Sequence, residues 1–151
     1  MAEEIAARIN ALPSGWMKAM GLRVTRAGAD EVACEWEVSE QHHQGYGIVH
    51  GGVFSGVIES LASIGAALVA MPRGQHVVGL ENHTSFLRAV RGGRLRAVAV
   101  PITRGRRSQV WEGRVLDEQD RLVATGRVRL LCLEGDDELA GERIRGPLQP
   151  G

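Results

Sequence analysis

One acidic residue stands out in the stretch from Gly51 to Met71, because Glu59 is its only charged side chain. The rest of the stretch is apolar or small, so a helix formed here would leave this carboxylate among apolar groups. Burying a carboxylate is costly unless a partner or a shifted pKa compensates. Glu59 is therefore either a structural acid held by an ion pair or hydrogen bonds, or a group at a catalytic site, and the stretch alone leaves both open.

A second feature that could take part in catalysis is the expected start of this helix at His50-Gly51-Gly52. Backbone N–H groups at a helix start lack intrahelical partners. Such N–H groups, at the positive end of the helix dipole, can stabilise a developing oxyanion. His50 and Glu59 are nine residues apart, which at about 100° and 1.5 Å per residue puts them on opposite sides of the helix, roughly 13 Å apart along its axis. One copy of the helix cannot bring both to one small reacting group.

Two copies can do so if their helices run antiparallel side by side. The start of one helix then lies near Glu59 of the other, and N–H groups near Gly51 and Gly52 share a site with that carboxylate. Ser63 lies one turn after Glu59 on the same face, where its hydroxyl could orient a water or hold the carboxylate. The spacing thus predicts a site shared between two chains.

The helix itself is predicted from Gly51 to Met71, where Pro72 ends it. One face should pack against a sheet, since apolar residues recur on it at three- and four-residue steps: Val53, Phe54, Val57, Ile58, Leu61, Ile64 and Leu68. The opposite face carries small residues besides the acid: Ser55, Gly56, Ala62, Ser63 and Ala66. An exposed face would carry several charges, so we expect a helix buried all round, with a second body on its small-residue face.

The elements around this helix indicate an antiparallel sheet. Residues 3–20 form a helical segment, and alternating apolar and polar residues predict strands at 22–25, 32–38, 77–86, 95–101, 108–116 and 122–133. This order indicates an α+β fold in which a curled antiparallel sheet wraps the long central helix. We expect a single domain over residues 1–133 and a disordered polar tail over residues 134–151.

Composition narrows the class of protein. The chain has 151 residues, 44% of them apolar and 24% charged, and its formal net charge is zero, which argues against a dedicated nucleic-acid binder. No apolar run reaches the ~18–20 residues that span a bilayer, and the charged N-terminus is no signal peptide, so we expect a cytoplasmic protein. We expect Cys34 and Cys132 to be small core residues, and His42 and His43 to be solvated loop residues without a metal-binding spacing.

The run from Gln44 through Gly45-Tyr46-Gly47-Ile48-Val49-His50-Gly51-Gly52, followed by Glu59, resembles the hotdog-fold acyl-CoA thioesterases. More narrowly, it resembles the branch that hydrolyses aromatic acyl-CoAs, such as the 4-hydroxybenzoyl-CoA, 1,4-dihydroxy-2-naphthoyl-CoA and phenylacetate-pathway thioesterases. The resemblance continues through residues 77–80, 86–88, 93–95, 109–111 and 126–128, so it covers about residues 15–133. It implies a hotdog fold.

The resemblance also implies a role for each site residue. The Gly51 N–H would polarise the thioester carbonyl, with Gln44 and His50 beside the thioester. Glu59 would act as nucleophile or as general base for water, and Ser63 would position that water. No metal or other cofactor is implied, since coenzyme A is part of the substrate. The expected assembly is a homotetramer, a dimer of dimers with active sites at the dimer interface.

Arginines gather in the second half of the chain. Seven of them and no acidic residue lie between Asn82 and Trp111. A solvated surface explains such a run, and RNA binding is disfavoured because no aromatic residues interleave. Coenzyme A, however, carries a 3′-phosphate and a pyrophosphate, which arginine can bind with paired donors. The resemblance assigns this role to Arg88 and, less directly, to Arg106 and Arg107, where relatives often have Ser or Thr.

Three questions stay open. A hydratase or dehydratase could share the fold, although the helix with Glu59 resembles the thioesterases. A non-catalytic acyl-CoA-binding module or sensor could keep the pocket and the arginines without turnover, but the retained acid and the lack of an attached DNA-binding domain favour the enzyme. Trp16 and Met20 either pack in the core or touch the substrate.

Overall fold

The computed structural model describes residues 1–12 and 15–144. The N-terminal half contains α1 (Ala2–Asn10), α2 (Trp16–Ala19), β1 (Arg23–Ala27), β2 (Val32–Glu37), η1 (Glu40–His42), α3 (Gly51–Ala70) and η2 (Met71–Arg73). The C-terminal half contains β3 (Gln75–Phe86), β4 (Arg94–Arg104), β5 (Ser108–Leu116), β6 (Leu122–Glu134), β7 (Glu138–Leu139) and β8 (Glu142–Arg143). Each strand expected from the alternation in the sequence therefore forms.

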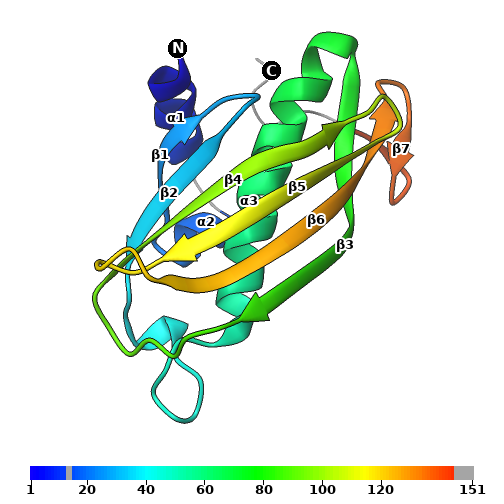
Figure 1. The fold of residues 1–151 in the computed structure, drawn as a ribbon. Coiled ribbons are helices and arrows are strands. Elements are labelled where there is room, and N and C mark those ends of the chain that lie inside the picture. Colours follow the sequence, from blue (N-terminus) through cyan, green and yellow to red (C-terminus); the bar gives the residue numbers. More distant parts are fainter. Residues whose placement is uncertain (13–14, 145–151) are drawn as a thin grey trace.

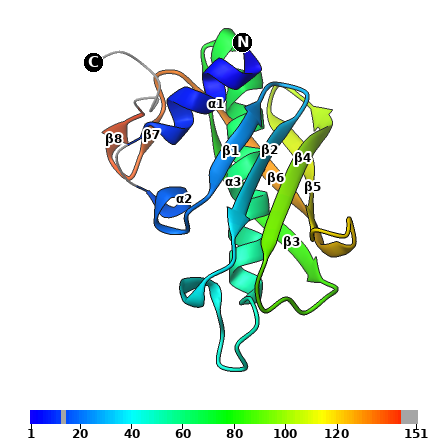
Figure 2. The same ribbon diagram turned by 90° about the vertical axis from the view of Figure 1, so that its left-hand side faces the viewer.

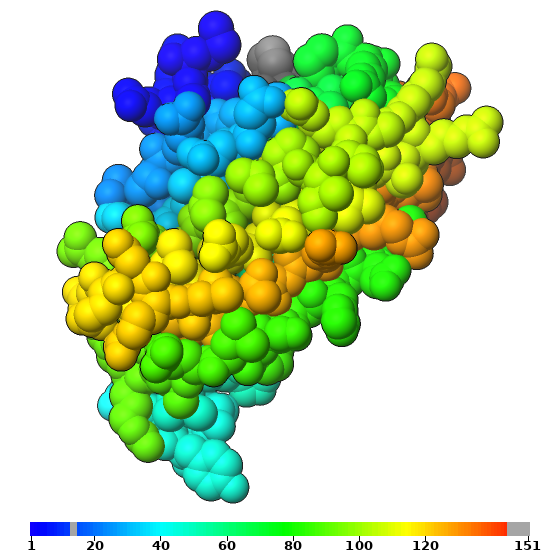
Figure 3. Space-filling view, viewed as in Figure 1, coloured from blue at the N-terminus to red at the C-terminus, as the bar shows by residue number. Residues whose placement is uncertain are grey.

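The main sheet has six strands in the order β1-β2-β4-β5-β6-β3, and each pair of neighbours is antiparallel. It curls around α3, which crosses behind the strands in Figure 1. In the space-filling view the sheet hides most of that helix, whose C-terminal end emerges at the top (Figure 3). The predicted α+β arrangement, a long central helix wrapped by a curled antiparallel sheet, is confirmed.

The buried face of α3 differs in part from the predicted one. The predicted residues are buried up to Leu61, but Ile64 and Leu68 are only partly buried, and Ala62 and Ala66 are fully buried instead. The cause is Trp111 of β5, whose indole lies against Gly65: a Cβ on that glycine would be 2.3 Å from a ring carbon. Small residues on this side of α3 make room for the indole, so these small residues belong to the core.

We predict that Gly65→Ala destabilises the fold. Alanine is intrinsically better than glycine in a helix by about 1 kcal/mol, but the added methyl would overlap the Trp111 ring. Overpacking of a close-packed core typically costs about 1–3 kcal/mol, and the upper end applies here because Trp111 is fully buried, so we expect a net loss of about 2 kcal/mol in the free energy of unfolding. Urea unfolding measures this.

The matched control for this variant is Gly92→Ala, because nothing lies within 4 Å of a Cβ there. Gly92 is in a loop, and its substitution should leave the urea midpoint unchanged. Equal midpoints for the two variants would contradict the role given to Trp111.

The two edges of the sheet differ in whether another element covers them. Helix α1 lies along β1 (Figure 2), and Asn10 bonds the backbone of that edge strand twice. Its Nδ2 donates to the Val24 carbonyl at 2.8 Å, and its Oδ1 accepts from the Val24 N–H at 2.9 Å. No described strand pairs with the outer edge of β3, the strand at the other side of the sheet. One edge is thus covered and the other is open.

The end of the chain is more ordered than expected. A disordered tail was predicted from residue 134, yet β7 and β8 pair as a hairpin, with Glu138 opposite Arg143. The physical reason is the turn, in which Ala140 and Gly141 adopt φ angles of 53° and 82°; consecutive left-handed residues are what a tight hairpin turn requires. Residues 145–151 of the predicted tail lie outside the described part of the chain.

Helix α3 also corrects an expectation about membranes. With η2 it forms a stretch, Gly51–Arg73, that is long and apolar enough to cross a membrane by length and composition. The expectation that no apolar run is long enough to span a bilayer is therefore wrong, since the mean hydropathy of this stretch is 1.8. Half of the helix is buried inside the structure, and a central core helix has the same composition as a spanning one.

Both cysteines are free thiols. Cys34 is buried in the core as expected, and burial raises the pKa of its thiol to about 12. Cys132 is only partly buried. At neutral pH Cys34 is therefore a protonated, apolar core residue and a poor nucleophile.

Candidate active site

The start of α3 presents one unpaired donor. His50 caps the helix: its Nδ1 accepts the Gly52 N–H at 2.8 Å, and its carbonyl accepts the Val53 N–H at 2.9 Å. The Gly51 N–H bonds to no acceptor within residues 1–12 and 15–144. We expected free donors at both glycines, but the imidazole takes the second. The free N–H of Gly51 lies at the positive end of the α3 dipole.

An aromatic ring covers the same point. The Phe86 side chain, at the end of β3, lies so close to Gly51 that a Cβ there would be 2.4 Å from its Cε2. The Phe86 ring also packs against Phe54, with centroids 6.3 Å apart, yet Phe86 remains 56% exposed. Any side chain at position 51 would overlap the Phe86 ring where it now lies, and the free N–H lies beside that partly exposed ring.

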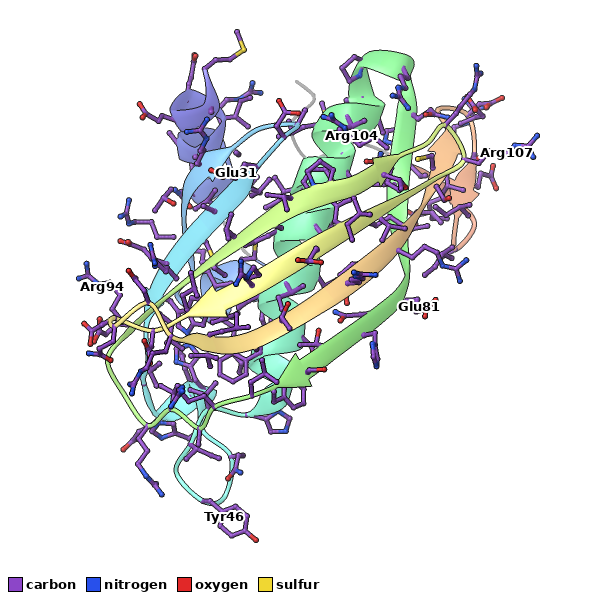
Figure 4. The ribbon with its side chains drawn as sticks, viewed as in Figure 1. Glu31, Tyr46, Glu81, Arg94, Arg104 and Arg107 are labelled. Atoms are coloured by element: carbon purple, nitrogen blue, oxygen red, sulfur yellow. The ribbon has the colours of Figure 1, made fainter. Side chains whose placement is uncertain are left out.

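A cavity of about 300 Å³ at this end of α3 brings together Gln44, Gly51, Phe86 and Arg88. Gln44 belongs to a protruding loop whose tip is Tyr46 (Figure 4). Its side-chain oxygen accepts the Tyr46 N–H, and Arg91 holds the loop by donating to the Tyr46 carbonyl at 2.8 Å. Three of the predicted site residues therefore meet in one cavity, with His50 at the adjoining helix cap.

Glu59 and Ser63 line a second cavity, of about 450 Å³, together with Trp16, Gly52 and Gly56. The carboxylate was expected to be buried, but in the single chain it is exposed. The reason is that little besides α2 covers this face of the helix; in Figure 2, α3 lies between α2 and strands β4–β6. Within one chain, the carboxylate and the Gly51 donor thus belong to different cavities, as the helix geometry predicted.

The sequence reasoning missed Asn82, which holds Glu59. Asn82 Nδ2 donates to Glu59 Oε2 at 3.2 Å and to the Ser55 carbonyl at 2.9 Å. Its own Oδ1 accepts the Thr84 hydroxyl at 2.7 Å. The available signal was an alternation of polar residues in β3: the cross-strand partners of Asn82 and Thr84 are buried residues of β6, so both side chains lie on the face that covers α3.

His42 also departs from the prediction of a solvated residue. It is 1% exposed, and its Nδ1 accepts the Ser39 N–H at 2.9 Å. The ring proton is therefore on Nε2, which donates to the Met20 carbonyl at 2.7 Å. The His42 carbonyl accepts the His50 N–H at 2.8 Å. His42 consequently joins the end of α2 to the cap of α3.

The arginine run divides into paired and unpaired residues. Arg94, Arg96 and Arg104 form ion pairs with acids from other elements, and Arg91 binds loop carbonyls. The structure describes all seven arginines of the run, and the three whose side chains have no polar partner are those predicted to bind phosphate: Arg88, Arg106 and Arg107.

These three arginines do not lie together in one chain. Arg88 lines the cavity at the start of α3, whereas Arg106 lines a cavity of about 510 Å³ with Arg73, Gln75 and Arg104. Arg107 lies at the same end as Arg104, far from the Tyr46 loop (Figure 4). A single ligand could contact all three only if copies of the chain combine.

Residues 46–124 match the family described as the thioesterase superfamily. The chain belongs to this superfamily. It is similar to the proofreading thioesterase EntH of Cronobacter sakazakii, with 38% identity over 126 residues, which are 83% of this chain and 91% of EntH.

Solved structures agree with this membership. Rv1847 of Mycobacterium tuberculosis is 40% identical, with a TM-score of 0.77 over 78% of this chain and 95% of that one. The thioesterase HI1161 of Haemophilus influenzae is 28% identical, with a TM-score of 0.77 over 89% of this chain and 91% of that one. The fold of this thioesterase-superfamily protein is the hotdog thioesterase fold.

We predict that Gly51→Ala destabilises the protein through Phe86. The added Cβ would overlap the ring, and overpacking of this kind costs about 1–3 kcal/mol in the free energy of unfolding. In a Phe86→Ala background the same substitution should cost less than about 1 kcal/mol, because the overlapping atoms are gone. A double-mutant cycle in urea measures the difference. An equal loss in the free energy of unfolding in both backgrounds would contradict the explanation. Gly45→Ala, where nothing lies within 4 Å of a Cβ, is the control from the neighbouring loop.

Proposed function

We propose that this thioesterase-superfamily protein hydrolyses acyl-CoA thioesters, with preference for aromatic acyl groups, at sites shared between two copies of the chain. The observation that carries the proposal is the unpaired Gly51 N–H at the start of α3, in one cavity with the unpaired Arg88. An N–H aimed at a carbonyl and a cation for phosphate are the two contacts that an acyl-CoA needs at that point. Membership of the superfamily supports thioester hydrolysis as the reaction.

In the proposed mechanism the thioester oxygen accepts the Gly51 N–H, and the helix dipole stabilises the negative charge that develops on it. Glu59 of the second copy either attacks the carbonyl carbon itself or removes a proton from an attacking water held by Ser63. The tetrahedral intermediate collapses with cleavage of the C–S bond, and coenzyme A leaves as the thiolate. Direct attack would leave a mixed anhydride that water then hydrolyses. Asn82 keeps the carboxylate in place by its hydrogen bond.

The sheet edges support the two-chain arrangement. The outer edge of β3 is open over a 12-residue strand, and an open edge can pair with another strand. Antiparallel pairing of two β3 strands would set the two α3 helices antiparallel beside each other. The start of one helix would then approach Glu59 of the other, joining the two cavities of the single chains into one site.

We propose a further pairing of such dimers into a tetramer. Arg107 lies at the end of the molecule that holds Arg104 (Figure 4), and Arg106 shares a cavity with Arg104. Arg88 lines the cavity at the start of α3 instead. If all three bind the phosphates of one coenzyme A, the first two come from a neighbouring copy. The aromatic preference is supported by the exposed faces of Phe86 beside Gly51 and of Trp16 beside Glu59.

We predict that Glu59→Gln lowers thiol release by at least ~10²-fold, the scale of a lost catalytic carboxylate. The substrates are 4-hydroxybenzoyl-, phenylacetyl-, dihydroxynaphthoyl-, hexanoyl- and palmitoyl-CoA, and the wild type should turn over an aromatic one fastest. Glu81→Gln is the control. Like Glu59, Glu81 is an exposed acid, but it belongs to β3 and forms an ion pair with Arg129.

The alternatives give other results in the same assay. A Glu59→Gln variant as active as the wild type would make Glu59 a structural acid. Tight binding of acyl-CoA without thiol release would make the protein a binding module or sensor, the second candidate that the unpaired arginines allow.

Subunit mixing tests whether the site is shared. Glu59→Gln and Gln44→Ala proteins should each be impaired, and co-refolding them in equal amounts should restore about a quarter of wild-type activity, since half of the dimers are mixed and each has one intact site. Rates are compared with the unmixed proteins at the same concentration. If both variants assemble and exchange but no activity returns, the site lies within one chain.

A further inference from the structure

Trp16 is the one half-exposed tryptophan of the chain. Trp36 and Trp111 are 3% and 0% exposed, whereas Trp16 is 42% exposed. Its benzo ring lies on the surface of α3 at Gly56, where a Cβ would be 2.5 Å from Cη2 and 2.6 Å from Cζ2. The benzo ring thus contacts the helix at Gly56, and much of the rest of the indole remains open.

The backbone that carries Trp16 is held at both ends. Helix α2 starts after Gly15, with φ of 119°, and is followed by Gly21, with φ of 67°, so both turns use conformations that favour glycine. The Leu22 N–H donates to the Met17 carbonyl at 2.9 Å. The buried His42 donates to the Met20 carbonyl at 2.7 Å. The indole therefore stands at a defined place beside the helix.

That place is the cavity of Glu59. Trp16 and Met17 form one side of it, and the α3 side is made of small residues with the single carboxylate: Gly52, Gly56, Ser60 and Ser63. The indole rests on the helix at Gly56, and beside that contact the cavity is lined by the open part of the indole and by Glu59, Ser60 and Ser63. An aromatic ring placed there gains contact area and stacking with the indole, which a flexible or branched chain gains less well.

We infer that the Trp16 indole forms a wall of the acyl-binding slot beside Glu59 and sets which acyl groups are accepted, favouring flat aromatic ones. This rests on the proposed function, since it takes the ligand of the slot to be the acyl part of the thioester. Trp16 acts here as a specificity-determining residue of the subunit that supplies Glu59. Of the two alternatives that the sequence leaves open for Trp16, the inference takes contact with the substrate over packing in the core.

The first test compares acyl selectivity. The ratio of kcat/KM for 4-hydroxybenzoyl-CoA to that for hexanoyl-CoA should fall about tenfold or more in Trp16→Ala, and much less in Trp16→Phe, which keeps a flat ring. Gly56→Ala should also lower the ratio, because the methyl would displace the indole; this variant keeps the test valid if Trp16→Ala does not fold. Ile102→Ala, at an exposed apolar residue of β4, is the control and should leave the ratio unchanged. Ratios equal to wild type in Trp16→Ala and Gly56→Ala would overturn the inference while leaving the proposed hydrolysis standing.

The second test does not depend on turnover. In Glu59→Gln protein, binding of 4-hydroxybenzoyl-CoA should quench tryptophan fluorescence, and the quench should vanish in Glu59→Gln/Trp16→Phe, since the other two tryptophans are buried. Calorimetric titration with the same ligand confirms that both proteins bind it. A quench that persists without Trp16, binding without any quench, or no binding at all would each overturn the inference. A quench with no thiol release by the wild type would support the slot and refute the hydrolase.

Discussion

The hydrogen bond from the Gly52 N–H to the His50 ring is the contact on which the start of α3 depends. The ring satisfies one donor and the His50 carbonyl satisfies the next, so the unsatisfied donor is reduced to the Gly51 N–H. A side chain at position 51 would have to displace the Phe86 ring. Through the carbonyl of His42, which accepts the His50 N–H, the cap is tied to a buried histidine and from there to α2. A single helix start thus positions a donor, an aromatic face and the N-terminal segment.

The exposure of Glu59 follows from how α3 is covered. Sheet residues enclose one side of the helix, while the other side has little more than α2 against it. An exposed carboxylate is not destabilised by lost hydration, so the single chain tolerates it. In the proposed pair of chains the same carboxylate would be partly desolvated, and the Asn82 hydrogen bond would then matter more for its orientation. The acid thus costs the single chain little, and it would gain its chemical environment only in the proposed pair.

Local periodicity predicted the elements well, and contacts between distant residues account for what it missed. The 3.6-residue pattern placed α3 to within a residue, and alternation located each strand of the main sheet. The same pattern assigned Ala62 and Ala66 to the wrong face, because periodicity within the helix contains no information about the Trp111 indole that packs on it from β5.

For the site, too, some residues were predicted from the sequence and others depend on contacts between distant residues. Gly51 and Gln44 were predicted at the thioester and Arg88 at the coenzyme A phosphates, and the structure brings the three into one cavity. The separation of Glu59 from Gly51 followed from helix geometry. Asn82 and His42 were missed because their partners, Glu59 and Met20, are 23 and 22 residues away. Their polar side chains looked like surface residues until the fold supplied acceptors for them. The covering of the β1 edge by Asn10 has a consequence for growth of the sheet. In the proposed pair of chains joined through β3, the combined sheet would have a covered β1 at both ends, so further strands could not add and filaments would not form.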